Sequence, residues 1–119
     1  MKLLRSFGYA WRGLVVALRE QLNLRIHFMA LTLVVTAGIW FQITATEWVI
    51  ITLTAALVIS LELVNSSIEN LTNLVTREHH PLAGKVKDIA AAAVLIAAIG
   101  ALVAGIAIFA KYFLRLFSG

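Results

Sequence analysis

The chain has 119 residues, of which 61% are hydrophobic and only 13% are charged. This length predicts a single domain, and so few charges could not cover the surface of a soluble fold, which predicts an integral membrane protein. The absence of cysteine excludes disulfides and thiolate metal sites, and a net charge of +4 suits an anionic membrane surface better than nucleic acid.

Residues 1–25 are predicted to form an amphipathic helix on the membrane surface. Leu3, Phe7 and Trp11 recur at helical spacing, and basic residues such as Arg5 and Arg12 lie between them. This pattern directs arginines toward lipid phosphates and rings toward acyl chains. The alternative is a solvated basic face packed on the protein itself. The surface interpretation is favoured because an apolar segment follows directly.

Three apolar segments are predicted to cross the membrane, at 26–43, 48–64 and 89–109. The first is short for a bilayer, which needs about 20 residues, but tilt or a helix continuous with the preceding segment can supply the length. The third is rich in alanine and glycine, which let helix backbones approach closely, so we expect it in a packed interior.

The ends of these segments predict their orientation. Trp40, Phe41 and Trp48 flank the turn 44–47 as an aromatic belt. Eight of the ten Lys and Arg residues lie in the N-terminal segment or within 65–88, and none lies in the turn. The positive-inside rule then places the N-terminus in the cytoplasm, with Lys111 and Arg115 as weak exceptions.

A polar stripe leaves the second apolar segment, whose helix is predicted to continue to Thr76. Glu62, Asn65, Glu69 and Asn73 fall within a sector of about 80° on a helix. A carboxylate near the end of a membrane span is costly, which makes Glu62 a candidate functional residue. Because one bundle of three helices would leave Glu62 poorly shielded from lipid, we expect subunits to associate around it.

This stripe suits phosphoryl transfer, which needs a metal held by carboxylates, cations for phosphates and a base near the attacking hydroxyl. Glu62 is placed to act as general base on a lipid hydroxyl, and Glu69 to hold metal. Asn65 lies between them and could orient either group. The plainer alternatives are a snorkelling or capping role for Glu62 and an ordinary surface position for Glu69.

A second polar group opens the third span, after a predicted loop at 77–84. Lys85, Lys87 and Asp88 could bind phosphates, or they could be only interface anchors and helix N-terminal charges. His79 and His80 could form a zinc site, but adjacent histidines without a third placed ligand are weak evidence for one. A position near a nucleotide is the preferred interpretation.

Several motifs resemble the prokaryotic diacylglycerol kinase and undecaprenol kinase family. They are Glu62-Leu-Val-Asn65-Ser-Ser-Ile68-Glu69, Glu78-His-His80-Pro-Leu-Ala-Gly-Lys-Val-Lys87-Asp88, Ala90-Ala-Ala-Ala-Val94-Leu, Gly8-Tyr9-Ala-Trp11-Arg-Gly13 and Asn23-Leu-Arg25-Ile-His27. The resemblance covers nearly the whole chain. The last motif and the His-Pro-Leu-Ala piece resemble the undecaprenol kinase branch more than the diacylglycerol branch.

The resemblance implies a homotrimer in the bacterial inner membrane, with three spans per chain and active sites shared between subunits. It implies Mg²⁺-dependent transfer of the ATP γ-phosphate to a lipid alcohol, undecaprenol or diacylglycerol. Glu62 would be the catalytic base that meets the lipid, with Asn65 beside it and Glu69 as metal ligand. Trp11 would belong to the lipid entry face. The residues that would contact the nucleotide are Tyr9, Glu78, His80, Lys87 and Asp88.

Two positions depart from the family pattern, and both remove negative charge near the expected metal. Gln21 stands where the family has a second metal-binding glutamate, and Glu20 is one residue too early. On a helix one residue is about 100° of rotation, so Glu20 could substitute only through a bulge or slip. Asn73 stands where an aspartate is usual.

These departures define a second hypothesis, a weakened or inactive relative that binds nucleotide or lipid. A third hypothesis, a small structural or channel-like oligomer whose polar stripe lines a pore, leaves Lys87 and Asp88 unexplained.

Overall fold

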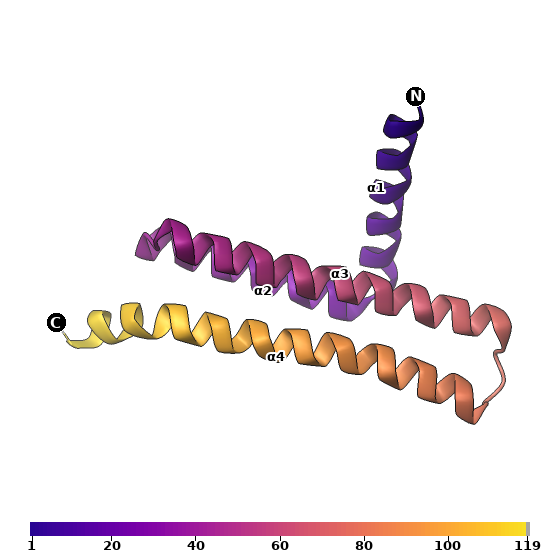
Figure 1. Ribbon diagram of the computed structural model, residues 1–119. Coiled ribbons are helices and arrows are strands. Elements are labelled where there is room, and N and C mark those ends of the chain that lie inside the picture. The colour runs from indigo at the N-terminus through magenta and orange to yellow at the C-terminus, as the bar shows by residue number, and fades with distance from the viewer. Residues whose placement is uncertain (119) are drawn as a thin grey trace.

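The computed structural model describes residues 1–118, and every element in that part of the chain is helical. The helices are α1 (Lys2–Glu20), α2 (Leu22–Phe41), α3 (Ala45–Val75) and α4 (Pro81–Ser118). Helices α2, α3 and α4 run side by side as long rods, whereas α1 leaves them at a steep angle (Figure 1). The predicted all-α class is confirmed.

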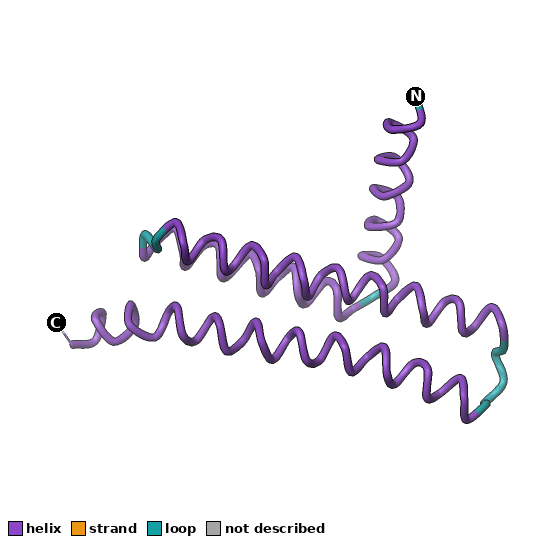
Figure 2. Tube along the Cα trace, in the orientation of Figure 1, coloured by secondary structure: helices purple, strands orange, loops and turns teal. Residues whose placement is uncertain are grey.

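Three of these helices, α2, α3 and α4, are long and apolar enough to cross a membrane, as the sequence predicted. They differ in length, with 20 residues in α2, 31 in α3 and 38 in α4. Because each residue adds about 1.5 Å, α3 and α4 extend well beyond α2. The α3–α4 hairpin therefore projects past the three-helix part, with its loop at one end of the molecule and the C-terminus at the other (Figure 2).

The predicted boundary of the first helix at residue 25 was wrong. Gln21 has φ −112° and ψ 109°, which is extended backbone, so α1 ends at Glu20 and residues 22–25 belong to α2. This break turns the chain from α1 into α2. By contrast, the predicted continuation of the second spanning helix beyond its apolar run is confirmed, since α3 ends at Val75.

The predicted loop at 77–84 was too long, because Pro81 begins α4. Proline suits the first position of a helix, where its fixed φ is already helical and its missing N–H has no partner to lose. His80 completes this start. Its Nδ1 accepts a hydrogen bond from the Leu82 N–H at 3.1 Å, and its carbonyl accepts one from the Gly84 N–H at 3.0 Å.

At the opposite end, Glu47 ties three segments together. Its N–H donates to the Thr44 hydroxyl at 3.2 Å, and its Oε1 accepts from the Thr44 N–H at 2.9 Å, which is a capping box. Its Oε2 lies 2.7 Å from Lys111 Nζ on α4, and the Tyr112 hydroxyl donates to Oε1. The start of α3 is thereby fixed to the end of α4.

The expected aromatic belt is only partly exposed. Trp40 is 68% exposed, but the Phe41 ring packs against Tyr112, with ring centroids 5.6 Å apart. Trp48 lies against Gly38, where an added Cβ would stand 2.7 Å from the Trp48 ring, so only glycine permits this approach. Two of the three rings therefore pack within the bundle at this end.

Candidate active site

The polar stripe runs along α3 from the interior to the surface. Since α3 is one uninterrupted helix, Glu62, Asn65, Glu69 and Asn73 share the sector that the sequence predicted. Glu62 is 1% exposed and Asn65 is 6% exposed, whereas Glu69 is half-buried and Asn73 is exposed. The stripe thus begins within the three-helix part and ends on the projecting hairpin.

Glu62 is buried without being fully paired. Its Oε2 lies 3.9 Å from His27 Nε2 on α2, which is beyond hydrogen-bond distance, and its Oε1 has no hydrogen-bond partner. Asn65 Oδ1 and Ser66 Oγ are also buried and unpaired. Buried polar atoms in proteins are normally hydrogen-bonded. Three unpaired acceptor atoms within two helical turns therefore indicate a place where another group donates.

Ser66 was not among the predicted site residues, although its position in the sequence carried a signal. Ser66 follows Glu62 by four residues, which places it only about 40° away around a helix, at the edge of the stripe. Its hydroxyl is as buried as the Asn65 amide, with 5% of the residue exposed.

The prediction that one chain would leave Glu62 poorly shielded was wrong. Glu62 is already 1% exposed within the single chain, and His27 of α2 faces it from the neighbouring helix. The shielding of Glu62 therefore gives no reason for subunits to associate.

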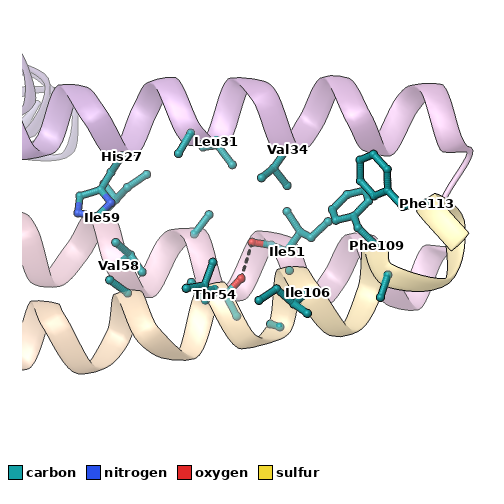
Figure 3. A pocket seen from close by; sticks show the side chains of 18 residues that line it. His27, Leu31, Val34, Ile51, Thr54, Val58, Ile59, Ile106, Phe109 and Phe113 are labelled. Carbon is teal, nitrogen blue, oxygen red and sulfur yellow. Dashed lines mark hydrogen bonds between the residues drawn. The ribbon is translucent and has the colours of Figure 1, made fainter.

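A groove of about 740 Å³ lies between α2, α3 and α4, with His27 at one end and Phe113 at the other (Figure 3). Its lining is apolar apart from His27 and Thr54. The Thr54 hydroxyl donates to the Ile50 carbonyl at 2.9 Å within its own helix. The groove therefore suits a hydrocarbon chain, and its one free polar group stands next to Glu62.

The start of α4 meets the outer end of the stripe. Lys87 Nζ donates a hydrogen bond to Asn73 Oδ1 at 2.7 Å. Asp88 and Glu78 are exposed nearby in sequence, and His80 uses its Nδ1 to begin α4. The structure thus brings Lys87 of α4 into contact with Asn73, which lies one helical turn after Glu69 on α3.

Tyr9 and Trp11 do not join this group within one chain. They are 63% and 68% exposed on α1, which stands away from the α3–α4 hairpin (Figure 1). The Arg12 guanidinium lies over the Tyr9 ring, 5.2 Å from its centroid. Any contact between these rings and the stripe must come from another arrangement of α1 or from another subunit.

The expectation that Glu20 could replace Gln21 only through a bulge or slip rested on a continuous helix. Because the backbone at Gln21 is extended and lies outside the helix, the helical rotation of about 100° per residue does not apply between Glu20 and Gln21. Both residues lie at the turn between α1 and α2.

Within residues 1–118, no three His, Cys, Asp or Glu side chains are grouped closely enough to hold a metal by themselves. Mg²⁺ seldom needs such a cage, because it is usually held by one or two carboxylates together with substrate phosphates and water. Glu69 is half-buried and forms no ion pair in the described part of the chain, and Asn65 Oδ1 is an unpaired oxygen. This set of oxygen donors fits Mg²⁺ bound together with a phosphate ligand.

Together these features define a helical membrane protein in which a buried carboxylate, Glu62, lies beside His27 at one end of an apolar groove, and in which the same helix meets a lysine of the α4 start about three turns further on. The sequence model of the prokaryotic diacylglycerol kinase family matches residues 8–109, and the chain belongs to that family. This confirms the family resemblance seen in its motifs.

Curated relatives carry two names. The diacylglycerol kinase of Synechocystis is 42% identical over 104 residues, which cover 87% of this chain and 59% of that protein. The undecaprenol kinase of Bacillus subtilis is 37% identical over 108 residues, covering 91% of this chain and 88% of its own length. The diacylglycerol kinase of Escherichia coli is 32% identical over 102 residues, covering 86% and 84%. Both names denote lipid kinases, which is the enzyme class of the family.

Proposed function

We propose that this protein transfers the γ-phosphate of ATP, with Mg²⁺, to the hydroxyl of a membrane lipid alcohol, undecaprenol or diacylglycerol. The reaction takes place at the cytoplasmic surface of the bacterial inner membrane, with the N-terminus in the cytoplasm. The observation that carries the proposal is Glu62, a buried carboxylate with one unpaired oxygen, which lies 3.9 Å from His27 at the end of an apolar groove.

The groove supports a lipid substrate. A hydrocarbon chain that lies between α2, α3 and α4 would make van der Waals contacts with apolar side chains. It would leave no polar atom of the protein without a hydrogen-bond partner. His27 marks the end at which the lipid hydroxyl would lie, because this side chain lines the groove and is 3.9 Å from Glu62. His27 would contact the hydroxyl, while Glu62 accepts its proton.

The reaction then needs one proton transfer and one phosphoryl transfer. As the lipid oxygen forms its bond to the γ-phosphorus, Glu62 takes the hydroxyl proton, and the bond from the γ-phosphorus to the bridging β-oxygen breaks to release ADP. The Ser66 hydroxyl would donate a hydrogen bond that orients the Glu62 carboxylate, and the Asn65 Oδ1 would accept one from a donor bound at the site.

The nucleotide would occupy the outer end of the stripe. Lys87 there supplies a positive charge to the phosphates, and Glu69 would hold Mg²⁺, which neutralises phosphate charge when bound. Asp88, Glu78 and His80 lie at or near the start of α4, where they would contact the rest of the nucleotide.

A homotrimer with shared active sites follows from the family resemblance. It also gives α1 a function, because Tyr9 and Trp11 of one subunit could reach the α3–α4 hairpin of the next, or the path by which lipid enters. Cross-linking in bilayers tests this arrangement, since a trimer must give bands of two and three chains and no larger species.

The decisive experiment is a kinase assay on purified protein in bilayers that contain either undecaprenol or diacylglycerol, with ATP and Mg²⁺. We expect phosphate transfer to at least one of the two alcohols. No transfer to either, from protein shown to be folded by its helical circular dichroism, would defeat the proposal.

One observation favours a weakened catalyst instead. Glu69 is the only carboxylate of the outer stripe, and Gln21 provides at most a neutral amide where the family has a glutamate. A Mg²⁺ titration of the Gln21→Glu variant separates the two cases. A large gain in activity at low Mg²⁺ would show that the natural site is weakened at this position, and an unchanged titration would show that it is not.

A further inference from the structure

The contact between Lys87 and Asn73 has a chemistry that the family resemblance does not explain. It joins α4 to α3 across 14 residues of sequence by a hydrogen bond of 2.7 Å from the ammonium to the amide oxygen. The partner of the ammonium is neutral. Within residues 1–118, the basic side chains that lie within 4.0 Å of a carboxylate are His27, near Glu62, and Lys111, near Glu47, so no carboxylate lies within 4.0 Å of Lys87.

The neutral partner leaves the Lys87 ammonium charged, held in place and able to donate further hydrogen bonds. An ammonium has three N–H donors, and the amide oxygen uses one of them, so two remain for other acceptors. The amide also fixes the position of a long side chain that would otherwise lose rotamer freedom on binding a ligand. Because the amide carries no charge, the full positive charge of Lys87 is kept.

The residues around Lys87 favour the binding of an anion to its ammonium group. Asn73 lies four residues after Glu69, one helical turn further out on the same face, and Lys87 is half-buried on the facing helix. An aspartate at position 73 would pair with Lys87 and cancel its charge. A polyphosphate would then have to displace that carboxylate or bind near a neutral pair.

We propose that Asn73 is a positioning residue that holds Lys87 in place for the phosphates of the nucleotide while leaving its charge free. This inference rests on the proposed function, because it takes Lys87 to be a phosphate-binding residue. It gives Asn73 a function other than the loss of a carboxylate near the metal. The amide at position 73 strengthens nucleotide binding, whereas a carboxylate there would weaken it.

The test compares Asn73→Asp with Asn70→Asp and Lys87→Met in the full-length protein. Asn70 is an exposed asparagine on the same helix that forms no hydrogen bond with Lys87, so Asn70→Asp adds the same charge without touching the contact. The measurements are the dissociation constant of a non-hydrolysable ATP analogue with Mg²⁺, the thermal midpoint, and kcat and KM for ATP where turnover is measurable.

We expect Asn73→Asp to raise the dissociation constant and the KM for ATP by roughly two- to fivefold, the upper part of the range that one exposed charge pair supplies. Its thermal midpoint should be kept or raised, because the hydrogen bond to Lys87 becomes charge-assisted. Asn70→Asp should change the dissociation constant by much less. A purely structural role for Asn73 would instead move the thermal midpoint and leave nucleotide affinity alone.

Two results would overturn the inference. If Asn73→Asp tightens nucleotide binding or lowers the Mg²⁺ needed for it, position 73 belongs to the metal site. If Asn73→Asp matches Asn70→Asp while Lys87→Met still weakens binding, Lys87 binds phosphate without help from Asn73. Failure of the proposed role of Lys87 in phosphate binding would give a different result, because Lys87→Met would then leave nucleotide affinity unchanged.

Discussion

Helix α3 carries two buried glutamates whose surroundings differ in one respect. Glu47 is 7% exposed, and both of its carboxylate oxygens have partners in Thr44, Tyr112 and Lys111. Glu62 is 1% exposed, and its Oε1 has no partner while its Oε2 has only His27 at 3.9 Å. Burial is similar, but hydrogen bonding is complete at one end of the helix and incomplete at the other.

We propose that this difference separates a structural residue, Glu47, from a functional one, Glu62. A buried carboxylate that meets a cation, a hydroxyl and a backbone N–H contributes to holding helices together. A buried carboxylate that lacks partners is costly to the fold, and such a cost is typical of sites that a ligand completes. The charge of Lys111, one of the two basic residues that ran against the charge rule in the sequence, is balanced by Glu47.

The largest expected effect is on activity at Glu62. Glu62→Gln should lower kcat by about 10²- to 10⁴-fold, the contribution typical of a general base, because an amide cannot accept the hydroxyl proton. Its thermal midpoint should be unchanged or higher, since a buried and incompletely paired charge is removed. The measurement is phosphate transfer to lipid alongside thermal unfolding in detergent. Near-normal turnover would mean that another group is the base.

The next effect is on stability at Glu47. Glu47→Gln should lower the thermal midpoint clearly, because it breaks the ion pair with Lys111 and weakens the capping box of α3. Activity per folded molecule should stay close to that of the unchanged protein at low temperature. Lys111→Met serves as the partner control, and the two losses should not add, because both remove one interaction. Additive losses would mean that the ion pair is not their common cause.

A smaller effect is expected at the end of the groove. His27→Gln should raise the KM for the lipid alcohol by roughly three- to tenfold and leave the KM for ATP unchanged, since one hydrogen bond to the hydroxyl is altered. Thr54→Val is the matched control, because Thr54 lines the same groove with a hydroxyl that is bonded within its own helix. Equal effects of the two substitutions would show that groove shape, not His27, is responsible.

The smallest effect tests the cap beside Glu47. Thr44→Ala should cost about 1 kcal/mol of stability, the typical value for an N-cap threonine, with no change in kcat. Equilibrium unfolding in a mixed detergent measures the difference. A change in turnover larger than the change in folded fraction would show that the two ends of α3 are coupled. The end that contains Glu47 would then not be purely structural.

Much of this architecture could be predicted from the sequence because apolar runs and helical spacing are local signals. The stripe on α3 followed from the 3.6-residue period, and the predicted loop placed Lys87 at the opening of the next span, but the contact of Lys87 with Asn73 was not predicted. The break at Gln21 was missed, because no glycine or proline marks it. The boundary at Pro81 was misplaced, although proline commonly opens helices.

Contacts between distant segments were not predictable in the same way. Thr44 and Glu47 have the spacing of a capping box, which is a local signal, but their link to Lys111 and Tyr112 depends on how α4 packs on α3. The burial of Glu62 likewise depends on how α2 lies over α3. That cover was expected from other subunits, because the period of polar and apolar residues along a helix does not specify which neighbouring helix will pack on it.

The most direct measurement compares Glu62→Gln with Glu47→Gln, each purified and reconstituted separately into bilayers of the same composition. Lipid phosphorylation per folded molecule and the thermal midpoint are recorded for each variant. We expect opposite results, with turnover lost and stability kept in Glu62→Gln, and stability lost and turnover per folded molecule kept in Glu47→Gln. If both variants lose turnover only in proportion to their loss of folded protein, Glu62 is one more structural carboxylate and the account is wrong.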